Sequence, residues 1–162
     1  MASAYHSPGQ LLDDALRLVF ELVRRQITAF NEVGFLPVHT DAYSGTFVSP
    51  SDLRTLLDGG RPPSPEGIEQ LAAIDRGIAA LAREMEARLA ASRAAGRPLI
   101  FDTVRRALGL SPTEARALLV VVACEINQRV RHMMRYLVND AVRLHPDVGF
   151  VEQLVYSAPE LR

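Results

Sequence analysis

Apolar residues recur along this chain at alternating steps of three and four, the spacing that places side chains on one face of an α-helix. The first such segment runs from about Gln10 to Asn31, and Gly34 and Pro37 are expected to end it. Its apolar positions are Leu12, Leu16, Val19, Val23, Ile27 and Phe30. The pattern therefore predicts one helix with a broad buried face.

Between Phe35 and Ser49 the pattern changes to short β-prone pieces, FLPVH and GTFVS, which predict at most a small irregular hairpin. Ser49 and Pro50 then form a helix-start signal for a short helix, DLRTLLD. The tract at 61–65, with two adjacent prolines, resembles a linker. We therefore divide the chain into an N-terminal part, 1–60, the linker-like tract, 61–65, and a helical part, 66–162.

A second long helix is predicted from Ser64 and Pro65 to about Ala95, with Gly96 as its stop. A narrow apolar seam runs along it at Leu71, Ile74, Ile78, Leu81 and Met85. The seam needs an apolar partner, which is either the Gln10–Asn31 helix or a second copy of the chain. Packing within the chain is favoured, because short isolated coiled coils are only marginally stable.

The clearest helix start follows a short predicted helix, Leu99–Leu108. Ser111 and Glu114 have the spacing of a capping box, in which each side chain accepts a hydrogen bond from the other residue's backbone amide. The helix that begins there, Pro112–Ile126, is apolar nearly all round between Ala117 and Cys124. We expect it to lie at the centre of the core, buried on every face.

Two further helices are predicted after it. One spans about Asn127 to Leu144 and is broken at His145 and Pro146, and Asp147 can cap a last one. The apolar residues of that last helix are Phe150, Val151, Leu154 and Val155. The expected fold is mainly α, with a winged-helix or helix-turn-helix-like C-terminal half and at most a small β-hairpin.

Composition removes several classes of chemistry. All 18 basic residues among the 162 are arginine, so a lysine-dependent phosphate-binding loop and a Schiff-base lysine are both excluded. The formal charge of -1 provides no general attraction for nucleic acid or anionic lipid. The single cysteine, Cys124, lies in an apolar run and is predicted to be a buried structural thiol. With no signal peptide and no apolar run long enough to span a bilayer, we expect a cytoplasmic protein without membrane contact.

The segment Leu99–Ile126 has the helix, turn, helix order of a DNA-binding motif. A recognition helix presents polar side chains to base edges, whereas the second helix here reads ALLVVVAC. The better candidate for a binding surface is a basic helix face made of Arg129, Arg131, His132 and Arg135. We add Tyr43 to this predicted partner-binding set.

Protein contact is favoured over nucleic acid at that face. Glu125 and Asp140 dilute its charge, and no aromatic residues alternate with the arginines to stack bases. Glu125 is expected to pair with an arginine or to reach solvent. The four histidines, His6, His39, His132 and His145, lack metal-ligand spacing, so we expect no metal, no cofactor and no catalytic residue in this chain.

The stretch Leu108–Leu154, beginning LGLSPTEARALLVVVACE, resembles the winged-helix-like segment that precedes the ATPase core in a family of bacterial AAA+ ATPases, several of them encoded with contractile injection systems. Upstream, DAYSGTFVSPSDLRTLLDG is similar to another segment of that family. Matching positions are Asp41, Gly45, Val48, Ser49, Leu57, Gly109, Leu110, Ser111, Glu114, Leu118, Leu119, Ala123, Glu125, Asn127, Arg129, Tyr136, Leu137, Asp140 and Pro146. Departures are Asn127 in place of an acid, Val130 in place of an aromatic residue, and His145 in place of a basic one.

The resemblance implies an N-terminal recognition or adaptor domain that recruits a protein substrate or partner to a hexameric motor. The ATPase core would lie in the same or another chain. Two alternatives remain open. One is a helix-turn-helix regulator that binds DNA through Arg129, Arg131 and Arg135, and the other is a helical dimerisation scaffold built on the Leu71–Met85 seam.

Overall fold

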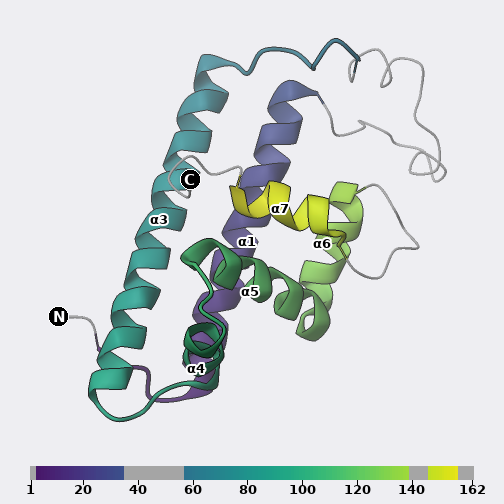
Figure 1. The fold of residues 1–162 in the computed structure, drawn as a ribbon. Coiled ribbons are helices and arrows are strands. Elements are labelled where there is room, and N and C mark those ends of the chain that lie inside the picture. The colour runs from purple at the N-terminus through teal and green to yellow at the C-terminus, as the bar shows by residue number, and fades with distance from the viewer. Residues whose placement is uncertain (1–2, 35–56, 139–145, 157–162) are drawn as a thin grey trace.

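A computed structural model of the chain describes residues 3–34, 57–138 and 146–156 (Figure 1). The helices in these ranges are α1 (Pro8–Val33), α3 (Pro65–Ala94), α4 (Ile100–Ala107), α5 (Pro112–Ile126), α6 (Gln128–Val138) and α7 (Val148–Tyr156). The described residues contain no strand, so the mainly α fold class is confirmed. The Phe35–Ser49 hairpin and most of the short helix after it fall outside the described residues, and the division at 61–65 stays a prediction.

Helix α1 begins and ends where local chemistry predicts. The Ser7 hydroxyl accepts a hydrogen bond from the backbone amide of Gln10, and Pro8 occupies the first helical position, where no amide hydrogen is needed. At the other end Gly34 adopts a φ of 78°, a left-handed conformation that glycine reaches without steric cost.

The apolar seam of α3 packs against α1, and the two long helices run antiparallel along most of their length (Figure 1). Ile74, Ile78, Leu81 and Met85 are all buried in the core that α1 shares. The predicted packing within the chain is thus confirmed. These side chains are not available to a second copy, which leaves the dimerisation scaffold without its expected surface.

Buried ion pairs fix the register of α1 against α3. Arg25 Nε donates to Asp75 Oδ1 at 2.5 Å. Towards the other end of the pair of helices, Arg88 Nη1 donates to Asp14 Oδ2 at 2.7 Å, and the hydroxyl of Tyr5 donates to the same oxygen at 3.0 Å. Each pair satisfies charges that would otherwise be costly to bury, so sliding one helix along the other would break both.

Helices α5, α6 and α7 pack against α1 as well, which places α1 at the centre of the molecule (Figure 1). The capping box that starts α5 is confirmed, because Ser111 N donates to Glu114 Oε2 at 2.8 Å and Glu114 N donates to Ser111 Oγ at 3.2 Å. Asp147 caps α7 as predicted, its Oδ1 accepting from the amide of Phe150 at 2.8 Å.

Helix α4 precedes α5 and is connected to it by a short turn in which Gly109 has a φ of 64°. Its buried Asp102 accepts hydrogen bonds from Arg93 of α3 at 2.8 Å and from Arg105 at 3.1 Å. Arg105 also bonds to Glu86 of α3. These ion pairs attach the first helix of the helix-turn-helix to the long helix. Within the described residues, no helix is both long and apolar enough to cross a membrane.

Candidate functional site

One side of α5, the second helix of the helix-turn-helix, is exposed, although the sequence predicts burial of this helix on every face. Val120, Ala123 and Cys124 are buried, as expected for a core helix. Val121 and Val122, however, are 44% and 38% exposed, and Ile126 is 53% exposed. The expectation that α5 is buried on every face is therefore wrong.

Helical geometry explains this exposure. Residues 120, 123 and 124 share one face of a 3.6-residue helix, and residues 121, 122, 125 and 126 share another. The first face packs into the core cluster with α1, α6 and α7, and the other face remains accessible. We call Val121, Val122, Glu125 and Ile126 the α5 flank. The half-buried Leu118 continues it towards the start of the helix.

The chemistry of the α5 flank differs from that of a base-reading helix. Its three aliphatic side chains offer no hydrogen-bond donor or acceptor, and its one charged residue, Glu125, is acidic. Sequence readout in the major groove depends on hydrogen bonds to base edges, and approach to DNA depends on cations that face phosphates. The α5 flank can instead cover apolar surface on another protein.

Arg131, one of the four predicted binding residues on α6, is engaged within the chain. Its Nε donates to the backbone carbonyl of Cys124 at 3.0 Å, and its Nη2 donates to the carbonyl of Glu125 at 2.8 Å. The guanidinium thus satisfies carbonyls that the last turn of α5 leaves without helical partners, and its charge complements the negative end of the helix dipole. This contact links the end of α5 to α6.

The other predicted residues have varied surroundings. The guanidinium of Arg129 lies over the ring of Phe20, 5.5 Å from its centroid, in cation–π geometry. His132 is exposed and Arg135 is half-buried. Tyr43 lies outside the described residues. None of these contacts tests partner binding, so the role of this set stays a prediction.

Cys124 is the buried thiol that the sequence predicts, with 1% of its surface exposed. Burial raises the pKa of its thiol to about 11, and the charge of Glu125 acts in the same direction. A thiol with this pKa is protonated at neutral pH and is a poor nucleophile. Within the described residues, no group of three or more histidine, cysteine or acidic side chains is placed to hold a metal ion.

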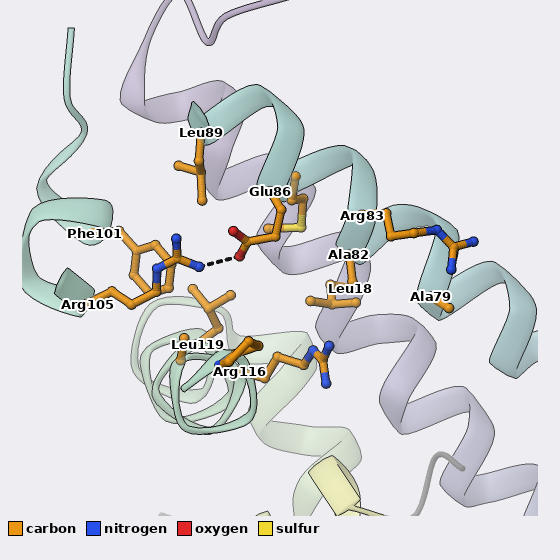
Figure 2. A pocket seen from close by; sticks show the side chains of 13 residues that line it. Leu18, Ala79, Ala82, Arg83, Glu86, Leu89, Phe101, Arg105, Arg116 and Leu119 are labelled. Carbon is orange, nitrogen blue, oxygen red and sulfur yellow. Dashed lines mark hydrogen bonds and ion pairs between the residues drawn. The ribbon is translucent and has the colours of Figure 1, made fainter. Parts of the chain in front are cut away.

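A pocket of about 380 Å³ lies between α3, α4 and α5 (Figure 2). Apolar side chains form much of its wall, and Glu86 and Arg105 bond to each other beside it. Arg116 of α5 also lines it. The sequence does not predict this site, because the pocket forms only where three successive helices, α3, α4 and α5, pack together, and no spacing within one helix marks its residues.

Comparison with known proteins identifies the family. The model of the winged helix domain, variant, matches residues 1–162, and no curated protein or solved structure matches the chain. The match agrees with the helix-turn-helix of α4 and α5 and with the packing of α5, α6 and α7 on α1. This chain belongs to the winged helix domain family, as a member of its variant form.

Proposed function

We propose that this winged helix domain is a protein-recognition module that uses the α5 flank to bind its partner. The observation that carries the proposal is the exposure of Val121, Val122 and Ile126 on the second helix of the helix-turn-helix. A winged helix domain is compatible with either DNA binding or protein binding, so our preference for one of them rests on the side chains of that helix. Exposed aliphatic side chains grouped on one helix favour a protein partner.

The charges around α5 support the same choice. The α5 flank carries Glu125 and no cation, and Arg131 is occupied at the carbonyl end of α5. A DNA-binding surface needs several cations free to neutralise phosphates at once. With a formal charge of -1, the chain has no long-range field that would compensate for the absence of cations on the α5 flank.

In its finer form, the proposal is that the domain is the non-catalytic adaptor of an AAA+ ATPase and recruits a protein substrate to a hexameric motor. Its support is the resemblance of Leu108–Leu154 to the segment before the ATPase core in that family. One departure from the family pattern is structurally conservative. Asn127 Oδ1 accepts from the backbone amides of Arg129 at 3.0 Å and Val130 at 3.2 Å, an N-cap role that an aspartate also fills. In this proposal the chain itself catalyses no reaction.

The test uses the full chain, tagged and produced in its native cells at its natural level. We expect it to elute from a sizing column in a complex with another protein, and a Val121→Asp, Val122→Asp variant to elute free. Binding would bury the two introduced carboxylates without partners. The cost of their desolvation would offset the free energy gained from apolar contact. The matched control is Ala80→Asp on the exposed side of α3, which should leave the complex intact.

The composition of the complex separates the two levels of the proposal. A partner with a nucleotide-binding loop supports the AAA+ adaptor role. A protein partner with no link to an ATPase contradicts that role but supports protein recognition. A complex that nuclease treatment disperses, and that survives the double substitution on α5, contradicts both.

A further inference from the structure

The pocket between α3, α4 and α5 combines an apolar wall with an excess of positive charge. Leu18, Met85, Leu89, Phe101 and Leu119 supply the larger apolar side chains. The charged lining residues are three arginines, Arg83, Arg105 and Arg116, against one acid, Glu86. The pocket therefore suits a ligand that has both an apolar part, which packs against the wall, and an anionic group, which the cations attract.

The three arginines are not equivalent. Arg105 bonds to Glu86 (Figure 2). It also bonds to the buried Asp102, so its charge is already balanced. Arg83 is exposed and is hydrated by solvent. Arg116 is half-buried and extends from α5 on the side away from the Glu86–Arg105 pair (Figure 2).

Among the three arginines of the pocket, Arg116 is the one whose buried hydrogen-bond donor the described part of the chain leaves without an acceptor. Its Nη1 is shielded from solvent and has no hydrogen-bond partner there. Glu86 attracts it electrostatically, but burial is the larger effect and lowers the pKa of the guanidinium. A buried donor without an acceptor is uncommon in folded proteins, because it loses its hydrogen bonds to water and gains nothing in return.

We propose that this pocket binds a carboxylate carried on a short apolar stem, with the guanidinium of Arg116 as the group that receives the carboxylate. In the proposed complex the N–H groups of Arg116 face the pocket that this residue lines, and the carboxylate accepts two of them in parallel. The stem packs against Leu89, Phe101 and Leu119. A free aliphatic acid and the C-terminal residue of a peptide share this chemistry. A pocket of about 380 Å³ has room for the carboxylate and apolar stem of either one.

The test is a titration of the ¹⁵N-labelled full chain, followed by its backbone amide and arginine Nε–H signals. The probes are sodium hexanoate, with 1-hexanol as its uncharged counterpart, and a tetrapeptide ending in leucine, with its C-terminal amide as counterpart. We expect saturable shifts in the arginine Nε–H signal of Arg116 and in the amides of the pocket. At least one carboxylate should bind ten times more tightly than its uncharged counterpart, and rising salt should weaken it.

Matched variants assign the effect to Arg116. Arg116→Met should weaken binding of the carboxylate at least tenfold, whereas Arg76→Met, on the exposed side of α3 outside the pocket, should leave it unchanged. Arg116→Met is expected to fold, because it removes a half-buried guanidinium whose shielded Nη1 has no hydrogen-bond partner among the described residues. Its melting temperature in the absence of ligand should equal or exceed that of the unmodified chain.

Each outcome has one meaning. Saturable binding of hexanoate identifies a small acid as the source of the carboxylate, and binding of the peptide alone identifies a protein C-terminus. The proposal is overturned if neither carboxylate gives saturable shifts, if hexanol and the peptide amide bind equally well, or if Arg116→Met binds like Arg76→Met.

Discussion

A buried ion pair connects the two long helices, α1 and α3. The Arg25–Asp75 pair lies between α1 and α3, and both side chains are about nine-tenths buried. Such a pair adds little compared with an apolar contact, yet it makes each partner dependent on the other. The register of α1 against α3 therefore depends on both residues of the pair, and substitution of either one alone is expected to be destabilising.

We predict that Asp75→Ala lowers the free energy of unfolding by about 3 to 5 kcal/mol, because it leaves Arg25 buried without a counter-charge. Urea unfolding followed by circular dichroism measures the loss. The control is Glu21→Ala, which removes the exposed partner of Arg24 and should cost less than about 1 kcal/mol. Equal effects of the two substitutions would contradict the account of a buried pair.

The buried thiol of Cys124 predicts a specific pH dependence. Its pKa is about 9 in the unfolded chain and about 11 in the folded one, so the unfolded state loses its proton first as the pH rises. The stabilising contribution is complete below pH 9 and is lost between about pH 9 and 11. By the free-energy equivalent of two pKa units, the loss is about 2 to 3 kcal/mol.

Urea unfolding at pH 7.5, 9, 10 and 11 measures this effect as a difference between the unmodified chain and Cys124→Ala. The variant lacks the thiol but keeps every other titrating group, including Tyr5, whose pKa burial also raises. We expect stability to fall less steeply with pH in the variant. Identical slopes in the two proteins would show that the thiol ionises freely in the folded state.

At the scale of the element, helix starts are set by local chemistry, and the sequence predicts them well. Serine followed by proline marks the first residues of α3 and α5, because the serine side chain accepts from a free amide and proline needs none. The Ser111–Glu114 capping box also lowers the pKa of Glu114, through hydrogen bonds from Ser111 to its carboxylate.

We predict that Ser111→Ala destabilises the domain by about 1 kcal/mol, because the amide of Glu114 loses its acceptor at the start of α5. Ser111→Thr keeps a hydroxyl at the same place and should retain most of the stability. Thermal unfolding of the three proteins at pH 7 provides the comparison. A loss in the threonine variant as large as in the alanine variant would mean that the hydroxyl is not what stabilises this turn.

The faces of helices were harder to predict from the sequence than their ends. The sequence predicts the seam of α3 correctly, because polar residues lie on either side of it and only one face can be buried. In α5 both Val120 and Val121 are apolar, and periodicity cannot say which of them faces α1. The role of Arg131 at the end of α5, and the pocket beside Arg116, depend on how separate helices meet, which no local spacing reveals.

At the scale of the whole molecule, α1 is shared between two sets of neighbours. Helix α3 covers it along one side, and α5, α6 and α7 pack on it as well (Figure 1). Because α5 uses only one face for this packing, the α5 flank of Val121, Val122, Glu125 and Ile126 is left accessible. The architecture therefore presents an apolar helix face at the position where the recognition helix of a DNA-binding helix-turn-helix presents polar side chains.

Site-specific photocrosslinking in the native cells tests this central claim most directly. A photoreactive amino acid at position 122 reports what contacts the α5 flank, and the same group at the exposed position 80 of α3 reports background contact. We predict crosslinked species at position 122 that protease destroys and nuclease leaves intact, and few at position 80. Crosslinks at position 122 to nucleic acid, or equal crosslinking at the two positions, would contradict recognition of a protein through α5.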